Sequence, residues 1–282
     1  MRRRWLFAFA LMALLAAAAR AQDPLGEEVP YIRTPQAVVD KMLDLAGVGP
    51  DDFLIDLGSG DGRIVITAAQ KRGARGFGVE LDTSLVEASN QAARKAGVAE
   101  RAQFFARDLF DTDIREASVL TMYLLPAVNL QLRPRLLAQL KPGTRVVSHD
   151  WDMGEWKPDA TAVLEGLVKP VMPVRASTTY LWIVPAKVAG FWALQLEGSG
   201  AGETMELEFT QHFQEIAGVA RRTRGRTMLQ SAHLRGPEIR FAVIDETRRP
   251  SEPLQFFGRV YGDTMEGSTG SGRRWRAERK PL

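Results

Sequence analysis

A glycine-rich loop between a short apolar segment and a helical one constrains this chain more than any other feature of its sequence. Residues 53–57 read FLIDL, and GSGDGR follows at 58–63 before a helical pattern that ends at Arg72. A buried strand that turns directly into a helix is typical of doubly wound α/β sheets, which bind ligands at the carboxyl ends of their strands. Glycine also lets the backbone come close to a ligand. The loop therefore predicts a ligand crevice at that edge of a sheet.

The segments around this loop alternate between strand and helix patterns up to about residue 187. Further strands are predicted at residues 76–80, 102–105, 118–123 and 144–149, and an antiparallel pair at 163–168 and 178–184. Helical patterns separate most of these strands, and such alternation favours a parallel, doubly wound sheet. We therefore expect a Rossmann-like α/β sheet of seven strands.

Local signals predict where the helices begin. Thr34, followed by Pro35, is a good N-cap for the first helix. Ser84 with Glu87 predicts a capping box for the helix after the second strand. Pro134 interrupts the helical stretch after the fourth strand, and a proline there is expected only to begin a new turn.

The charges near the loop indicate what kind of ligand it binds. A dinucleotide site needs the pattern G-x-G-x-x-G, and Arg63 stands where its third glycine would be. Asp56 and Asp61 would repel a phosphate group by about 1 kcal/mol for each close pair, even in bulk water. Two carboxylates instead suit a cationic ligand without phosphate, such as S-adenosylmethionine with its sulfonium and amino groups.

Two more acids follow the next predicted strands. Glu80 ends the second strand, 24 residues after Asp56, where an acid accepts hydrogen bonds from ribose hydroxyls in this architecture. Asp108 follows the third strand and is placed to meet the amino group of an adenine. The alternative is a structural turn with solvated acids, but the loop and both acids in register favour a ligand site.

The first 21 residues have the layout of a secretory signal peptide. Arginines at 2–4 precede an apolar run at 5–19, and residues 19–21 read ARA, an A-x-A cleavage site. The run is short for a bilayer span, which needs about 20 apolar residues, so no stable membrane span is expected after cleavage. We expect a periplasmic or secreted protein. An uncleaved anchor is the alternative, and it also leaves the rest of the chain outside the cytoplasm.

The net charge of the chain belongs to this leader. The whole sequence carries +3, but residues 1–21 hold four arginines and no acid, so the chain from Gln22 onward carries −1. That balance argues against a nucleic-acid partner. The absence of cysteine excludes a disulfide scaffold, a thiolate zinc site and a cysteine nucleophile, and we expect no metal.

The pattern changes after residue 187. Apolar and polar residues alternate, as at 205–210 and 239–243, and glycines break the runs. This predicts about six to eight short antiparallel strands in a small barrel or sandwich. We expect an all-β accessory domain at 188–282, with a structural or substrate-recruiting role.

The first half of the chain resembles the class I S-adenosylmethionine-dependent methyltransferases. Within them it is similar to the ATP-synthase c-subunit lysine methyltransferases and their bacterial relatives. The match is carried by residues 31–35 (YIRTP), 56–63 (DLGSGDGR), 78–81 (GVEL), 108–109 (DL) and 143–149 (GTRVVSH). The similarity covers about residues 30–185, and it implies a methyltransferase domain at 22–187.

The resemblance also implies a set of cofactor-binding residues. They are Tyr31, Thr34, Asp56, Gly58, Ser59, Gly60, Asp61, Glu80, Asp108 and Leu109. Asp56 and the loop glycines would hold the methionine end of S-adenosylmethionine, Glu80 the ribose, and Asp108 the adenine. The residues before the first helix would close over the cofactor.

The acceptor is expected to be a flexible amine. Methyltransferases of planar amines carry Asn/Asp-Pro-Pro-Tyr/Phe after the fourth strand, whereas residues 123–126 here read YLLP. That departure suits a protein lysine in an apolar channel beside Tyr123, and the candidate catalytic residues are Tyr123, Asn129 and His149. A methyltransferase of a small molecule or envelope lipid is one alternative. Another is an exported binding protein without catalysis, because S-adenosylmethionine is made in the cytosol.

Overall fold

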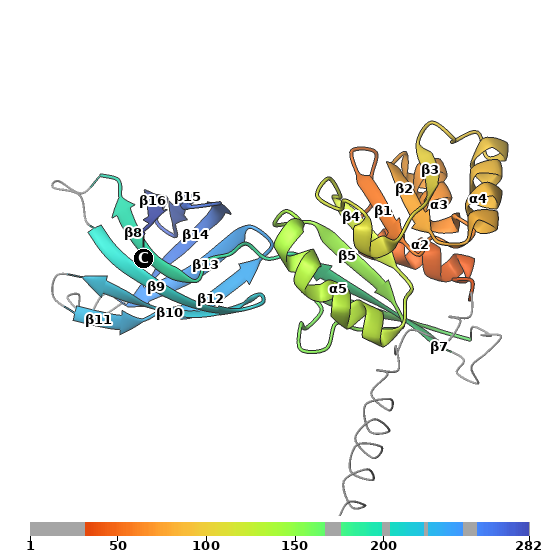
Figure 1. Ribbon diagram of the computed structural model, residues 1–282. Helices are drawn as coiled ribbons and strands as arrows, with labels where there is room; N and C mark the ends of the chain where they lie inside the picture. The colour runs from red at the N-terminus through yellow and green to blue at the C-terminus, as the bar shows by residue number, and fades with distance from the viewer. Residues whose placement is uncertain (1–31, 167–175, 199–203, 223–224, 245–252, 282) are drawn as a thin grey trace, which may run out of the picture. The chain divides into compact units, whose positions relative to one another are not determined.

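The computed structural model describes residues 32–166, 176–198, 204–222, 225–244 and 253–281 (Figure 1). They form two β-sheets, one of seven strands and one of nine. The predicted leader at 1–21 and Tyr31 lie outside the described residues. Within the described ranges, no helix is long and apolar enough to cross a membrane.

The first sheet has the strand order β3-β2-β1-β4-β5-β7-β6. Its strands are β1 (Phe53–Leu57), β2 (Arg75–Glu80), β3 (Ala102–Ala106), β4 (Val119–Met122), β5 (Arg145–His149), β6 (Ala160–Glu165) and β7 (Ala176–Ile183). The first five run parallel, and β7 is antiparallel to both β5 and β6. The predicted seven-stranded Rossmann-like sheet is confirmed.

Helices cover both faces of this sheet (Figure 1). They are α2 (Gln36–Leu45), α3 (Arg63–Arg72), α4 (Thr83–Lys95) and α5 (Pro126–Gln139), with a short 3-10 turn η1 (Leu109–Asp111). Leu54 of β1 joins the apolar cluster of α2, α3 and α4, whereas Ile55 joins that of α5. Alternate residues of a strand point to opposite faces, so β1 supplies both cores from neighbouring positions.

The predicted start of the first helix is wrong. α2 begins at Gln36 with Pro35 as its N-cap, and no side chain caps it. The Thr34 hydroxyl instead lies 3.3 Å from Nδ1 of His149, at the end of β5. A tertiary hydrogen bond has replaced the local cap that the sequence favoured.

Two further local predictions also fail. The N-cap of α4 is Asp82, whose carboxylate accepts from the backbone N–H of Ser84 at 2.8 Å, so the predicted box of Ser84 and Glu87 does not form. Pro134 does not interrupt α5, which continues through it to Gln139. Pro134 is exposed, so the carbonyl group that loses its helical partner there is within reach of water.

The second sheet is wholly antiparallel, in the order β11-β10-β9-β8-β16-β15-β14-β13-β12. Its strands are β8 (Gly190–Leu196), β9 (Thr204–His212), β10 (Glu215–Arg222), β11 (Gly225–Met228), β12 (Gln230–Arg235), β13 (Glu238–Ile244), β14 (Pro253–Tyr261), β15 (Thr264–Thr269) and β16 (Arg274–Arg279). The prediction of six to eight strands was too low, because β11 and β12 are mostly exposed and lack clear apolar alternation. Contacts between β10 and β12 bring the sheet near to a closed barrel.

Gly62 fixes the junction between the glycine loop and α3. Its φ is +75°, which L side chains rarely adopt, and a Cβ there would lie 2.5 Å from Cζ of Phe104. Gly97, which follows α4, has a similar φ of +70° but nothing within 4 Å of the same added atom. The two glycines share the same backbone conformation, but only Gly62 is also enclosed by a neighbouring side chain.

Gly62→Ala is therefore expected to destabilise the protein more than Gly97→Ala. Both replacements cost about 1–2 kcal/mol for the left-handed backbone, and Gly62→Ala adds about 1–3 kcal/mol of overpacking against Phe104. Urea unfolding followed by circular dichroism measures the difference in unfolding free energy. Equal losses in the two variants would contradict the close approach of Phe104.

Candidate active site

The glycine loop folds back on the end of β2. The backbone N–H groups of Gly58 and Ser59 both donate to the carbonyl oxygen of Val79, at 3.0 and 2.9 Å. The N–H of Gly60 donates to Oε2 of Glu80 at 3.1 Å. These bonds hold the loop against the carboxyl ends of β1 and β2, the edge at which the sequence predicts a ligand crevice.

Asp56 lies on β1 with a side chain that is only 1% exposed. Its Oδ1 accepts a hydrogen bond from Thr121 at 2.7 Å, and Oδ2 has no hydrogen-bond partner among the described residues. Burial, aided by the charges of Glu80 and Asp61, raises the pKa of Asp56 to about 7 despite the Thr121 hydrogen bond. A cationic group beside this carboxylate would favour its charged form.

Glu80 and Asp108 lie at the same edge, after β2 and β3. Oε1 of Glu80 accepts from the backbone N–H of Leu81 at 2.7 Å. Asp108 accepts from the N–H of Phe110 at 2.8 Å and caps η1, which begins at Leu109. Each carboxylate oxygen has two lone pairs, so both acids keep acceptor capacity for hydroxyl or amino groups of a ligand.

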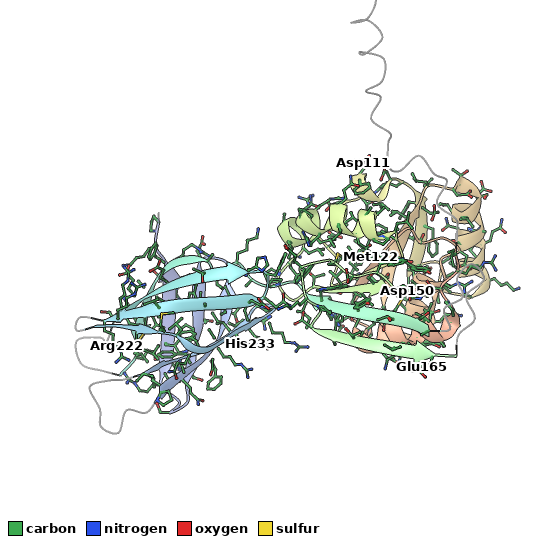
Figure 2. The ribbon with its side chains drawn as sticks, turned by 90° about the horizontal axis from the view of Figure 1, so that it is seen from below. Asp111, Met122, Asp150, Glu165, Arg222 and His233 are labelled. Carbon is green, nitrogen blue, oxygen red and sulfur yellow. The ribbon has the colours of Figure 1, made fainter. Side chains whose placement is uncertain are left out.

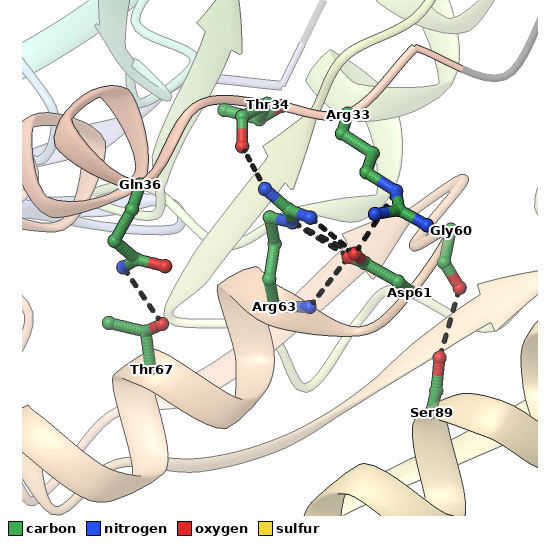
Figure 3. Close-up of polar contacts among 8 residues, drawn as sticks. All are labelled: Arg33, Thr34, Gln36, Gly60, Asp61, Arg63, Thr67 and Ser89. Atoms are coloured by element: carbon green, nitrogen blue, oxygen red, sulfur yellow. Dashed lines mark hydrogen bonds and ion pairs between the residues drawn. The ribbon is translucent and has the colours of Figure 1, made fainter.

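Asp61 makes contacts that its sequence position did not reveal (Figure 3). Its carboxylate accepts from Nε of Arg63 at 2.8 Å and lies 3.8 Å from Nε of Arg33. Arg63 also donates from Nη1 to the carbonyl oxygen of Thr34 at 2.8 Å. The Asp61 carboxylate is thus paired with arginine side chains, and its assignment to the cofactor stays a prediction.

Residues 33–36, which we call the strap, are tied to two parts of the site, and Figure 3 shows the ties to α3. The bond from Arg63 to Thr34 and a bond of 3.2 Å from Gln36 to Thr67 fix the strap to α3. The Thr34 hydroxyl fixes it to His149 on β5. The strap therefore links the helix that follows the glycine loop to the strand that carries a candidate catalytic residue.

Tyr123, directly after β4, lies against His149, the last residue of β5. Their ring centroids are 4.0 Å apart. His149 is 1% exposed, and its ring nitrogens face the hydroxyls of Thr34 and Ser177 at 3.3 and 3.0 Å. A buried imidazole held on both sides is well suited to position its neighbours. A catalytic role for His149 stays a prediction.

Asn129 lies on α5 and is fully buried. Its Nδ2 donates to Oγ of Ser148 at 3.2 Å and to the carbonyl oxygen of Trp151 at 3.1 Å, and its Oδ1 has no partner within the described residues. These bonds hold the loop after β5 in place. Its predicted catalytic role stays a prediction.

In the described part of the chain, no group of three or more His, Asp or Glu residues is arranged to hold a metal ion.

Asp150 was missed by the sequence analysis. The Tyr123 hydroxyl donates to its Oδ2 at 3.3 Å. Burial and the charge of Asp150 raise the pKa of Tyr123 to about 12, so the hydroxyl keeps its proton at neutral pH. The available signal was its position, because Asp150 follows β5 as Asp108 follows β3, at the edge where ligands bind.

Comparisons with known proteins agree with this geometry. A family model described as the ANTKMT methyltransferase domain matches residues 56–160. The protein-lysine N-methyltransferase of Saccharolobus islandicus is 44% identical over 138 residues, which cover 49% of this chain and 86% of that protein. The ATP-synthase c-subunit lysine N-methyltransferase of Mus musculus is 39% identical over 108 residues, covering 38% of this chain and 43% of that protein.

A solved methyltransferase structure is also similar to this chain. It is described as an RNA methyltransferase from Salinibacter ruber in complex with S-adenosyl-L-homocysteine. That protein is 53% identical, with a TM-score of 0.51, and the match covers 56% of this chain and 96% of that chain.

The seven-stranded sheet, the glycine loop and these similarities define a class I S-adenosylmethionine-dependent methyltransferase. The chain belongs to the methyltransferase family that includes the protein-lysine N-methyltransferase of S. islandicus. The predicted resemblance and the predicted cofactor, S-adenosylmethionine, are confirmed.

The residues present fit this cofactor, because Oδ2 of Asp56 and Oγ of Ser59 are buried polar atoms without a partner in the described structure. Asp56 and the loop would hold its methionine end, Glu80 its ribose and Asp108 its adenine.

The raised pKa of Asp56 predicts a pH dependence for the stability of the cofactor-free protein. In the folded state the carboxyl group holds its proton up to about pH 7, whereas the unfolded chain loses it near 3.8. The folded state therefore binds more protons in this range, and the unfolding free energy is expected to fall as the pH rises from about 4 to 7. Thermal unfolding should show a larger decline of Tm for the wild type than for Asp56→Asn, about 2–4 °C for each kcal/mol.

The same variant is expected to bind S-adenosylmethionine at least about tenfold more weakly at pH 8, because asparagine offers the cationic cofactor no charge. Isothermal titration measures the affinity of each protein for S-adenosylmethionine. An unchanged affinity would rule out the proposed role of Asp56 in cofactor binding. An identical decline of Tm in the two proteins would rule out the raised pKa of Asp56.

The strap predicts an effect of Arg63 on cofactor binding. Arg63→Lys keeps the charge but loses the planar fork that reaches Asp61 and Thr34 together. We expect affinity for S-adenosylmethionine to fall about threefold to tenfold. The matched control is Arg115→Lys, because Arg115 binds Asp113 at the same spacing on an exposed surface. Equal affinities in both variants would show that the strap does not support the cofactor site.

Proposed function

We propose that this chain transfers a methyl group from S-adenosylmethionine to the ε-amino group of a lysine in another protein. The observation that carries the proposal is the 44% identity that spans 86% of the S. islandicus protein-lysine N-methyltransferase. The YLLP stretch at 123–126 supports it, because that stretch lacks the signature of enzymes that methylate planar amines.

The residues around Tyr123 suit the chemistry of an amine acceptor. A lysine has an ordinary pKa near 10.4, so it must lose a proton before it is methylated. A site that excludes water favours the neutral amine. S-adenosylmethionine supplies an activated methyl group when bound, so the protein mainly aligns the acceptor and excludes water. Tyr123 is half-buried, and its ring centroid lies 4.0 Å from that of the buried His149, which limits the access of water on that side.

RNA is a second candidate acceptor, because the S. ruber protein that is 53% identical is described as an RNA methyltransferase. The charge of the chain argues against it. Without the predicted leader the chain carries −1, whereas proteins that bind phosphate backbones use positive surfaces. A lipid or small molecule is a third candidate acceptor. A separate alternative is that the protein binds its ligand without catalysing methyl transfer.

We also propose that residues 1–21 direct export, to the periplasm or beyond, and that residues 188–282 form an accessory domain. The arginines and the apolar run of the first 21 residues support export. An apolar cluster built mainly from the strands of the second sheet supports an accessory domain with its own core. Its role would be to support the enzyme or to recruit its acceptor.

The function is tested by methyl transfer from tritiated S-adenosylmethionine to an envelope extract. We expect the label in protein bands that proteinase K removes and that survive ribonuclease and lipid extraction, and hydrolysis should yield methyl-lysine. Asp56→Asn serves as the control with impaired cofactor binding. Label in RNA or in the lipid phase would replace lysine as the acceptor. Tight cofactor binding without any transfer would favour a binding protein.

A further inference from the structure

Asp150, the residue that follows β5, combines a strained backbone with a buried carboxylate. Its φ is +63°, which few residues except glycine adopt, and its side chain is 10% exposed. Strain of this kind clusters at ligand sites, and aspartate and asparagine tolerate it better than most residues. Met122, the last residue of β4, is paired with Ser148, two residues before Asp150, and Figure 2 labels both Met122 and Asp150.

The two carboxylate oxygens of Asp150 have different surroundings. Oδ1 accepts from the backbone N–H of Thr178 at 3.1 Å, and the N–H of Asp150 donates to the carbonyl oxygen of Thr178 at 2.7 Å. These bonds fix the residue to β7. Oδ2 accepts from the Tyr123 hydroxyl at 3.3 Å and lies 3.4 Å from Nε2 of His149.

The register of the sheet places this group at the cofactor edge. Asp56 on β1 is paired with Thr121 on β4, and Thr121 is paired with Val147 on β5. Tyr123 and Asp150 follow these partners by two and three residues, in the direction in which the glycine loop follows Asp56. The loop and the pair of Tyr123 and Asp150 therefore occupy the carboxyl ends of three neighbouring parallel strands.

We propose that Asp150 and Tyr123 form the acceptor subsite of this enzyme, and that the subsite binds a primary ammonium group. The inference rests on the proposed lysine methylation. Oδ2 of Asp150 receives the ammonium in a charge-assisted hydrogen bond. The Tyr123 hydroxyl donates its proton to Asp150, so its oxygen accepts from the same ammonium. His149, held by Thr34 and Ser177, positions the Tyr123 ring.

One proton moves in this subsite before the methyl group is transferred. An N–H bond of the ammonium breaks and an O–H bond forms at Asp150, which converts an ion pair into a neutral amine and a neutral acid. Exclusion of water favours the neutral form of the lysine amine. The nitrogen then forms a bond to the methyl carbon as the S–C bond breaks, and sulfur keeps the electron pair as a thioether. Asp150 releases its proton to solvent, and the product is a methylammonium.

The variant Asp150→Asn separates this role from a structural one. Asparagine keeps an oxygen for the N–H of Thr178 and tolerates the left-handed backbone. Its NH2 group replaces Oδ2, so the charge and the acceptor that faces Tyr123 and the proposed ammonium are lost. Asp152→Asn is the matched control. Asp152 lies two residues further along the same loop, is exposed, and accepts from the N–H of Gly154 at 2.9 Å.

Binding is tested without turnover by titrating n-butylammonium, which mimics the end of a lysine side chain, into the full chain saturated with S-adenosylhomocysteine. Ligand-observed NMR should detect binding to the wild type and to Asp152→Asn. Binding to Asp150→Asn should be at least about tenfold weaker, with an unchanged affinity for S-adenosylhomocysteine. Equal n-butylammonium affinity in the three proteins, or none in the wild type, would overturn the subsite.

Turnover on the labelled protein acceptor supplies an independent readout. Asp150→Asn should lower kcat/KM about 100-fold while the Kd of S-adenosylmethionine stays the same. Full activity of this variant would refute the inference and leave lysine methylation standing. A wild type that binds n-butylammonium through Asp150 but labels no protein lysine would refute the proposed function and leave the ammonium subsite standing.

Discussion

The buried carboxylate of Asp56, on an interior strand of a parallel sheet, is the feature on which the rest of the site depends. β1 is paired on both sides, with β2 and β4, so the side chain has little access to water and is 1% exposed. A buried charge is costly unless a cation or hydrogen bonds compensate it. The hydrogen bond from the Thr121 hydroxyl compensates the buried charge of Asp56 only in part, since the pKa of Asp56 remains raised to about 7. A cationic group bound beside Asp56 would therefore offset the cost of burying its charge.

The acids near the glycine loop have different surroundings in the protein. Asp61 is paired with Arg63 and lies 3.8 Å from Nε of Arg33, and its charge still helps to raise the pKa of Asp56. Asp61 also has a structural contact, because the same Arg63 holds Thr34 of the strap. Asp56 and Glu80 are the other acids that we predict to favour a cation and to repel a phosphate at the loop. In this motif Asp56 is buried on β1, whereas Asp61 is tied through Arg63 to the strap.

The parts of the fold that were predictable from sequence are those fixed by local pattern. β1 has the predicted bounds, since an apolar run that ends in glycines has few competing interpretations. Thr34 was misread as a cap because its partner, His149, lies 115 residues away in the sequence. Asp150 was missed because neither its left-handed backbone nor its partner Tyr123 leaves a local pattern. Contacts of this kind arise only when the strands assemble, so they escape rules that consider neighbours along the chain.

The predicted cofactor residues and the proposed acceptor subsite lie on two groups of strands of the same sheet. β1, β2 and β3 end in the loop and acids assigned to the cofactor, whereas β4 and β5 end in the pair of Tyr123 and Asp150. All five strand ends lie within residues 56–160, the range matched by the family model. The strap and β7 lie outside it, yet they hold His149 and Asp150 through Thr34 and Thr178. The proposed acceptor side is therefore supported from beyond the matched range. Because Arg63 also ties the strap to the helix after the glycine loop, a change in the strap would affect both sides of the site, whereas Thr178 on β7 contacts Asp150 alone of the two.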